Sequence, residues 1–159
     1  MDRTHIKDLT GKIGQKVSVS GWVDVRRNHG KLIFLVLRDG SGTVQAVANG
    51  KDEGVFQVAP DLRTEWCVEV VGEVKERPEK MRKDEFNGSI ELGVESISVL
   101  SKAKELPFEK DADLNIDTHF DYLPLTLRRE RTRDIFRVQA TILQAFRDSL
   151  VSWDFVEFQ

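Results

Sequence analysis

Phe34, Gln45 and Glu91 are three side chains of different chemistry in segments that resemble strands. An aromatic ring can stack on an unpaired nucleic-acid base, which contributes about 1–3 kcal/mol. An amide can donate and accept at a base edge, and a carboxylate can accept from the N–H groups of guanine or cytosine. A carboxylate repels phosphate, so Glu91 suits only a base edge. Each residue also has a plain structural explanation: packing under a helix or second domain, an ordinary surface position, or an ion pair with a nearby lysine.

Basic residues gather in two places although the chain is acidic overall. Of 159 residues, 24 are Lys or Arg and 27 are Asp or Glu, which gives a net charge of −3 at pH 7. That balance argues against a protein that holds nucleic acid by bulk charge. However, positions 26–38 hold three Arg, one Lys and one His without an acid, and positions 75–83 form a second basic segment. Two such segments predict a local anion-binding face, although polar loops would explain either segment alone.

The hydrophobic pattern predicts five strands before residue 100. They span 16–27, 31–38, 43–48, 66–77 and 89–99. The turn DGSG joins the second and third strands as a hairpin, and a weakly helical pattern at 51–64 follows the third strand. Gly21 indicates a bulge or tight bend in the first strand. The apolar positions of the fifth strand change parity near Glu95, which predicts a bulge there.

This order of elements is typical of one fold. Five strands with a helix between the third and fourth form the pattern of the OB-fold, a small all-β Greek-key barrel. An SH3-type barrel lacks a helix of that length at that place. OB-folds bind oligonucleotides around strands two and three, between the loop joining strands one and two and the loop joining strands four and five. Both basic segments fall at those loops.

Strand alternation assigns each residue to the interior or the outside of the barrel. If Ile33, Leu35 and Leu37 fill the interior, then Phe34, Gln45 and Glu91 face outward. On the first strand, alternation places Val17, Val19, Val23 and Val25 on one face together with Gly21. An interior position for Phe34 would contradict this interpretation.

The rest of the chain is predicted to be a linker and the start of a second domain. We expect the OB-fold domain at 1–103, a hinge or linker at 104–128 and a truncated domain at 129–159. Apolar residues at helical spacing predict one long amphipathic α-helix over 132–151, and WDFVEFQ is predicted to open a strand. A wide apolar helix face with nothing to pack on indicates that the remainder of this domain is missing.

Composition excludes several classes of protein. Cys67 is the one cysteine, so neither an internal disulfide nor a cysteine metal cluster is expected. The polar N-terminus has no signal-peptide pattern. No apolar stretch approaches the roughly 20 residues that span a membrane. We therefore expect a cytoplasmic protein without a membrane partner or a metal site.

The stretch VSGWVDVRRNHGKLIFLVLRDGSGTVQAV resembles the N-terminal anticodon-binding domain of the class IIb aminoacyl-tRNA synthetases, namely the aspartyl, asparaginyl and lysyl enzymes. The resemblance continues through WCVEVVGEV, NGSIEL and LPLTLR. It ends at IFRVQATILQAFRDSLVSWDFVEFQ, which is similar to the helix and strand entry of class II motif 1. Motifs 2 and 3, which hold ATP and the amino acid, are absent, so the resemblance implies no catalytic residues and no activity for this chain alone.

The resemblance also implies roles for individual residues. Phe34 corresponds to the family's aromatic that stacks on an anticodon base, and Gln45 to the glutamine that reads the middle uracil. Glu91 corresponds to the glutamate that reads guanine at the first anticodon position. The matches to basic residues near the anticodon-loop backbone are Arg26, Arg27 and Arg77.

The implied whole enzyme is an aspartate–tRNA ligase that uses ATP and Mg²⁺ and forms a homodimer through the 130–151 helix. Its tRNA would carry GU at the first two anticodon positions, and no cofactor is expected on this chain. LPLTLR and DIFRVQATI most resemble short aspartyl enzymes that charge both tRNA-Asp and tRNA-Asn. The alternatives are an asparaginyl or lysyl enzyme, or a free-standing OB module for single-stranded nucleic acid.

Overall fold

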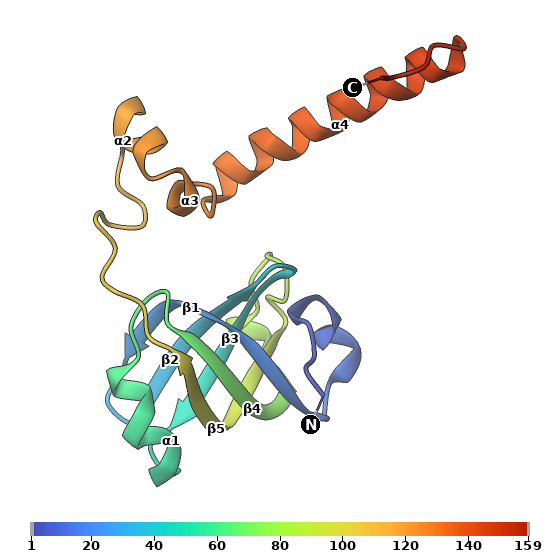
Figure 1. The fold of residues 1–159 in the computed structure, drawn as a ribbon. Helices are drawn as coiled ribbons and strands as arrows, with labels where there is room; N and C mark the ends of the chain where they lie inside the picture. Colours follow the sequence, from blue (N-terminus) through green and yellow to red (C-terminus); the bar gives the residue numbers. More distant parts are fainter. Residues whose placement is uncertain (1, 159) are drawn as a thin grey trace. The chain divides into compact units, whose positions relative to one another are not determined.

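The computed structural model describes residues 2–158, which form two compact units. The first unit ends at Glu105 and the second begins at Leu106. Five strands close the first unit into a barrel in the order β1-β2-β3-β5-β4 (Figure 1). They are β1 (Lys16–Asn28), β2 (Leu32–Asp39), β3 (Gly42–Asn49), β4 (Cys67–Glu76) and β5 (Ile90–Ser101). Every pairing is antiparallel except β3 with β5, and the predicted OB-fold is confirmed.

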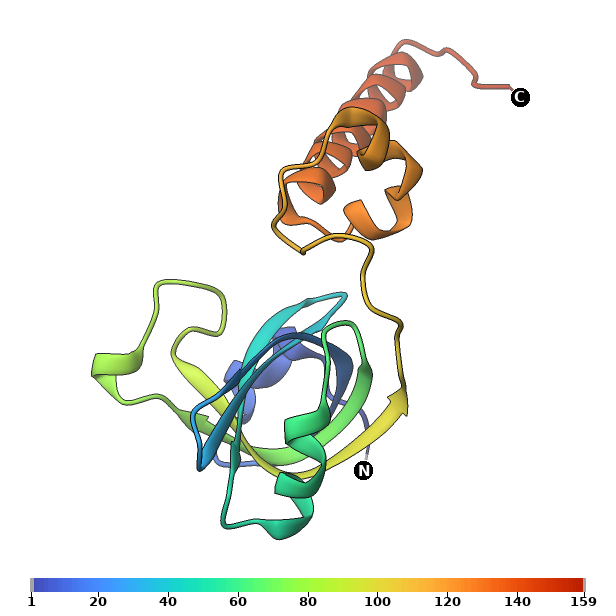
Figure 2. The same cartoon turned by 90° about the vertical axis from the view of Figure 1, so that its left-hand side faces the viewer.

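A short helix lies between β3 and β4, where the sequence predicts one. It consists of α1 (Glu53–Val58) and a following 3₁₀ turn, η2 (Ala59–Asp61). The helix is shorter than the predicted 51–64 because Pro60 lacks the N–H that would continue it. The side chain of Val55 joins the hydrophobic core, and Figures 1 and 2 show α1 at one end of the barrel.

Alternate strand residues fill the barrel interior. On β2, Ile33, Leu35 and Leu37 are fully buried, whereas Phe34 is half-buried on the outer side. The prediction that Phe34 lies outside the barrel is therefore confirmed. Burial of each large aliphatic side chain contributes about 1.5–3 kcal/mol, which explains why the interior positions are apolar.

A bulge in β5 shifts the residues that face the interior. Ser96 pairs with Val71 and Val94 pairs with Gly72, so Glu95 is the extra residue between them. The bulge predicted from the change of parity is confirmed at this position. It lets β5 keep apolar residues on the inner side both before and after Glu95.

A second bulge lies in β1 and corrects one prediction. Val23 pairs with Leu37 and Val25 pairs with Val36, so Asp24 is the extra residue. The prediction that Val25 shares a face with Val17, Val19 and Val23 is wrong, because the bulge turns this half-buried side chain toward the outer side. Gly21 has a different role from a bulge: an added Cβ would lie 2.6 Å from the carbonyl oxygen of Arg38, so glycine permits close approach of the strands.

A 3₁₀ helix before the barrel, η1 (Ile6–Lys12), is absent from the sequence-based prediction. Ile6 and Leu9 both have 0% exposed area and belong to the same hydrophobic core as the strands. Two buried residues within seven are too few to form a recognisable period. The segment between β4 and β5, at 78–88, is a loop as expected and includes one 3₁₀ turn, η3 (Glu79–Met81) (Figure 2).

The second unit contains helices α2 (Ile116–Asp121), α3 (Leu123–Thr126) and α4 (Glu130–Ser152). The first two lie inside the segment that the sequence predicts as a linker. The Asn115 side chain caps α2 by accepting a hydrogen bond from the Thr118 N–H at 2.8 Å. Pro124 stands in the first turn of α3, where its missing N–H has no cost, so a proline that indicated a linker begins a helix instead.

The long helix α4 extends slightly beyond the predicted 132–151 at both ends. Its exposed large apolar residues include Ile135, Val138, Ile142 and Phe146. Residues 155–158 lie outside any helix or strand, and the last residue of the predicted strand entry, Gln159, is outside the described part. Within residues 2–158, no helix combines the length and apolar character that crossing a membrane requires.

Candidate nucleic-acid interface

Phe34 presents an aromatic ring on the outer face of the barrel. Its partners across the sheet are Arg27 on β1 and Val47 on β3. The imidazole of His29, from the turn before β2, meets the ring edge to face with centroids 5.5 Å apart. A half-buried ring held by neighbours on both sides is preorganised for stacking on a flat ligand.

Gln45 and Glu91 meet on the same outer face, one strand further along. The parallel pairing of β3 and β5 places Ala46 beside Leu92, so the preceding residues of the two strands also lie together. Gln45 Nε2 donates a hydrogen bond to Glu91 Oε2 at 3.3 Å. The Glu91 side chain keeps 24% of its surface exposed. The structure therefore brings the amide and the carboxylate together where a base edge could reach both.

Arg77 lies beneath this pair rather than in solvent. Its side chain is 4% exposed, and its Nε is 3.9 Å from Glu91 Oε2. The Arg77 N–H donates to the Ser89 carbonyl at 2.8 Å, and its own carbonyl accepts from Arg82 Nε at 3.1 Å. A side chain so buried acts on its neighbours more readily than on a ligand in solvent.

Strand alternation places the adjacent residues Arg26 and Arg27 on opposite sides of β1, and the bulge at Asp24 decides which of them lies beside Phe34. Arg27 lies opposite Phe34 and shares the outer face, whereas Arg26 lies opposite the buried Leu35. Arg26 instead lines a cavity of about 880 Å³ between residues 60–66 and 102–105. Of the two arginines, only Arg27 is therefore grouped with Phe34 by the structure.

Arg38, within the first basic segment, is already bound by acids. Its Nε donates to Asp24 Oδ1 at 3.2 Å, and its Nη2 donates to Glu65 Oε1 at 2.7 Å. The guanidinium also lies 5.8 Å from the ring centroid of Trp22. The two carboxylates compensate the charge of Arg38 within the barrel. Because the side chain is also only 15% exposed, this charge is not available to a phosphate.

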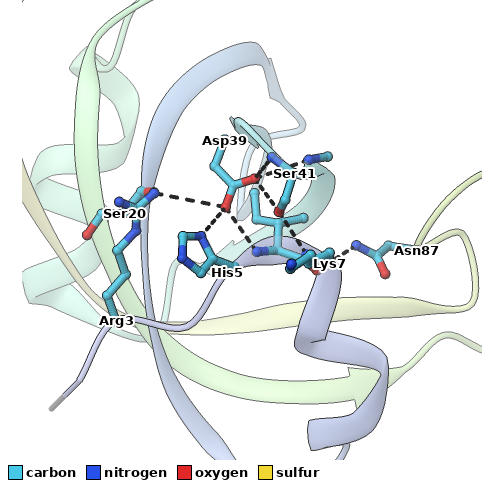
Figure 3. A network of polar contacts seen from close by, with 9 residues as sticks. Arg3, His5, Lys7, Ser20, Asp39, Ser41 and Asn87 are labelled. Carbon is cyan, nitrogen blue, oxygen red and sulfur yellow. Dashed lines mark hydrogen bonds and ion pairs between the residues drawn. The ribbon is translucent and has the colours of Figure 1, made fainter. Parts of the chain in front are cut away.

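Asp39 stabilises the turn of the β2–β3 hairpin, whose strands contain Phe34 and Gln45, through the hydrogen bonds drawn in Figure 3. Its Oδ1 accepts from the N–H and hydroxyl of Ser41, at 2.7 and 2.6 Å, and from the Gly42 N–H at 3.1 Å. Its Oδ2 accepts from the Ile6 N–H at 3.0 Å, which joins the hairpin turn to η1. One buried carboxylate thus fixes both the turn and the N-terminal segment.

The hydrogen bonds to Asp39 also decide its ionisation. Burial alone would raise the pKa of this carboxyl, because it disfavours the charged form. The hydrogen bonds donated by Ile6, Ser41 and Gly42 favour the charged form and outweigh burial, so the pKa lies below its ordinary value. Asp39 is consequently a carboxylate at neutral pH.

Asn87, from the segment between β4 and β5, completes the attachment by binding the carbonyl of Ile6, whose N–H binds Asp39. Its Nδ2 donates to the carbonyl of Ile6 at 3.0 Å (Figure 3) and to that of Thr43 at 3.1 Å. Its φ is 58°. Asparagine tolerates this left-handed conformation better than most residues. The sequence marks Asp39 and Asn87 as turn residues, but their contacts with distant segments leave no sequence signal.

No metal site emerges among residues 2–158, where no group of three His, Cys, Asp or Glu side chains could hold an ion. The chemistry that this face offers is recognition, through a stacking ring, an amide, a carboxylate and nearby cations. These groups suit an unpaired base and its backbone.

Comparison with known proteins agrees with this interpretation. The family described as "OB-fold nucleic acid binding domain" matches residues 17–100. Among curated proteins, the Aspartate--tRNA(Asp/Asn) ligase of Corynebacterium diphtheriae is 39% identical over 99% of this chain and 27% of its own length. The ligase of the same name from Halothermothrix orenii is 40% identical over 94% of this chain and 26% of its own length. The chain thus spans about a quarter of these relatives.

Solved structures of two synthetases are similar to this chain. The aspartyl-tRNA synthetase of Entamoeba histolytica aligns with a TM-score of 0.86 at 26% identity, over 100% of this chain and 39% of its own. The asparaginyl-tRNA synthetase of Pyrococcus horikoshii, complexed with asparaginyl-adenylate, aligns with a TM-score of 0.82 at 28% identity, over 100% of this chain and 36% of its own. The family match covers the closed barrel and the face that carries Phe34, Gln45 and Glu91, and the chain belongs to the OB-fold nucleic acid binding domain family.

Proposed function

We propose that this chain recognises the tRNA anticodon as part of an aspartate–tRNA ligase. The observation that carries the proposal is the grouping of Phe34, Gln45 and Glu91 on one outer face of β2, β3 and β5. The tRNA would carry GU at its first two anticodon positions. Phe34 would stack on an anticodon base, Gln45 would pair with the middle uracil, and Glu91 would accept from the N–H groups of the guanine.

The arginines would contribute differently. Arg27, which pairs with Phe34 across β1 and β2, would meet an anticodon-loop phosphate. Arg26 faces the cavity at residues 60–66 and 102–105 and would meet the backbone only if the RNA passed over that side. Arg77 is buried and would act through Glu91.

The whole ligase would couple ATP to the attachment of aspartate to tRNA. The names of the relatives include both tRNA(Asp) and tRNA(Asn), so we extend the proposal to both tRNAs. ATP and Mg²⁺ would be held by parts of the ligase outside this chain, because the resemblance includes neither motif 2 nor motif 3. We place the enzyme in the cytoplasm.

The second unit would belong to the catalytic part of the ligase. We propose that residues 1–103 bind the anticodon, 104–128 form the hinge and 129–159 begin a class II catalytic domain. The exposed apolar side chains of α4 favour a homodimer interface along this helix. Loss of dimerisation of the full-length ligase after Ile142→Glu, measured by sedimentation, would support this assignment.

Binding to short RNA hairpins tests the anticodon proposal directly. The chain should bind an anticodon stem–loop containing GUC more tightly than loops in which these bases are scrambled, measured by fluorescence anisotropy at fixed salt. Equal binding to all loops would refute anticodon recognition. Combined with a steep salt dependence, it would favour a sequence-tolerant module for single-stranded nucleic acid.

A further inference from the structure

We propose that Arg77 is a positioning residue that fixes the amide orientation of Gln45 through the carboxylate of Glu91. This inference rests on the proposed function, because it explains how the same face could distinguish uracil from cytosine at the middle anticodon position. It concerns a residue that does not itself need to touch the RNA.

The contacts form a chain from β4 through β5 to β3. Arg77 Nε lies 3.9 Å from Glu91 Oε2, and that same oxygen accepts the Gln45 Nε2 hydrogen bond at 3.3 Å. Arg77 directly follows β4, whose residues pair with β5 in register up to Glu76 opposite Ile90. The three side chains thus lie on neighbouring strands of one sheet face.

Burial holds the Arg77 charge in place. The side chain is 4% exposed, and Nε makes no hydrogen bond with any residue in the described range 2–158. Its main chain is bound on both sides, to the Ser89 carbonyl and to the Arg82 guanidinium. A buried guanidinium needs an anion nearby, and the structure pairs it with Glu91. This pairing holds Glu91 Oε2 between the buried guanidinium of Arg77 and the amide of Gln45.

An ionised carboxylate only accepts hydrogen bonds, so it selects one end of the Gln45 amide. The NH₂ group must face Glu91, which leaves the carbonyl oxygen and the second N–H for a ligand. Uracil offers an N3–H donor and an O4 acceptor, which match this fixed order. Cytosine offers the reverse, an N3 acceptor and an N4 donor. A free amide could turn by 180° about its terminal torsion and accept either base.

The test compares two anticodon stem–loops, GUC and GCC, bound to the full 159-residue chain. The natural chain should bind the uracil loop about tenfold or more tightly than the cytosine loop. Arg77→Gln removes the charge that orients Glu91, so this ratio should fall to about twofold. The matched control is Lys80→Gln, which removes an exposed cation from the neighbouring loop and should leave the ratio unchanged.

Three further measurements separate positioning from a general structural role. Arg77→Lys keeps the charge and should restore most of the ratio. In a Gln45→Ala background, Arg77→Gln should not change the ratio further, because the amide that it orients is gone. If thermal melting shows that Arg77→Gln does not fold, Glu91→Gln replaces it: its neutral amide can donate or accept, so the ratio should also fall.

The outcomes distinguish the inference from the function on which it rests. If the natural chain binds both loops equally, the middle base is not read and the inference fails. Anticodon recognition itself fails only if loops with scrambled anticodon bases also bind equally. If the natural chain prefers uracil and a folded Arg77→Gln variant prefers it equally, only the positioning role is overturned. A lower ratio that Arg77→Lys does not restore would likewise overturn positioning by charge.

Discussion

At the scale of single residues, Phe34 differs from the buried residues on either side of it by facing outward. We expect Phe34→Ala to weaken binding of the GUC stem–loop by about 1–3 kcal/mol, because the stacking surface is lost. The free energy of unfolding should change much less than for a core residue. Leu32→Ala is the control, since Leu32 is an exposed aliphatic residue on the same side of β2. Equal weakening by both variants would contradict stacking as the role of Phe34.

Asp39 gives a prediction about stability and pH. The pKa of Asp39 in the folded chain lies below its ordinary value of 3.8. As pH falls, this carboxylate therefore takes up a proton in the unfolded state before it does so in the folded state. The stabilisation is fully present above about pH 4 and is lost as pH falls through the folded pKa. We expect Asp39→Asn to lower the free energy of unfolding by about 2–4 kcal/mol at pH 7. Both carboxylate oxygens accept hydrogen bonds, and the asparagine NH₂ group that replaces one of them cannot accept.

Denaturant unfolding at pH 7 and pH 3 measures this effect. The difference between the natural chain and Asp39→Asn should narrow at the lower pH. Asp8→Asn, on the exposed side of η1, is the control and should have little effect at either pH. A difference that stays constant across this range would show that ionisation of Asp39 does not stabilise the fold.

Strand alternation alone predicts the outward positions of Phe34, Gln45 and Glu91, because a strand repeats every two residues. The burial of Arg77 has no such signal. The main chain of Arg77 is bound by the Ser89 carbonyl and by the Arg82 side chain, and neither contact follows from the pattern of β4. Local periodicity predicts which side a residue faces, but not what covers it.

At the scale of elements, Gly21 tests the close approach of β1 and β2. Gly21→Ala should lower the free energy of unfolding by about 2 kcal/mol or more, because the new Cβ would meet the Arg38 carbonyl oxygen at 2.6 Å. Gly54→Ala is a matched control in α1, where an added Cβ meets nothing within 4 Å. It should stabilise the chain by about 0.5–1 kcal/mol through helix propensity. Thermal or denaturant unfolding of both variants gives the comparison, and equal effects would refute the steric argument.

The two bulges show why one element is predictable from sequence and another is not. The bulge at Glu95 leaves a shift in the apolar positions of its own strand. The bulge at Asp24 does not, because its valines continue the same parity. The carboxylate at the bulge is bound by Arg38, which Glu65 also binds from a distant turn. Tertiary contacts of this kind lie outside the information in a single strand pattern.

At the scale of the whole molecule, the two units differ in how they are stabilised. The buried hydrophobic core contains residues from Ile6 to Val94 and, among the described residues, none from the second unit. We therefore expect a chain ending at Glu105 to unfold with a free energy within about 0.5 kcal/mol of the full chain, because its core is complete. Denaturant unfolding followed by tryptophan fluorescence of Trp22 and Trp66 measures this. A large loss of stability would show that residues 106–159 support the barrel.

The contact between Gln45 and Glu91 bears on when, during folding, the proposed binding face is complete. These residues are 46 positions apart and come together only where β3 and β5 close the barrel. Closure of so long a loop belongs to the slow, non-local part of folding. A partly synthesised chain that ends before β5 already carries the ring and the amide but lacks the carboxylate. Under the proposed anticodon recognition, selectivity depends on completing the sheet, because the carboxylate is the last of the three groups to be synthesised.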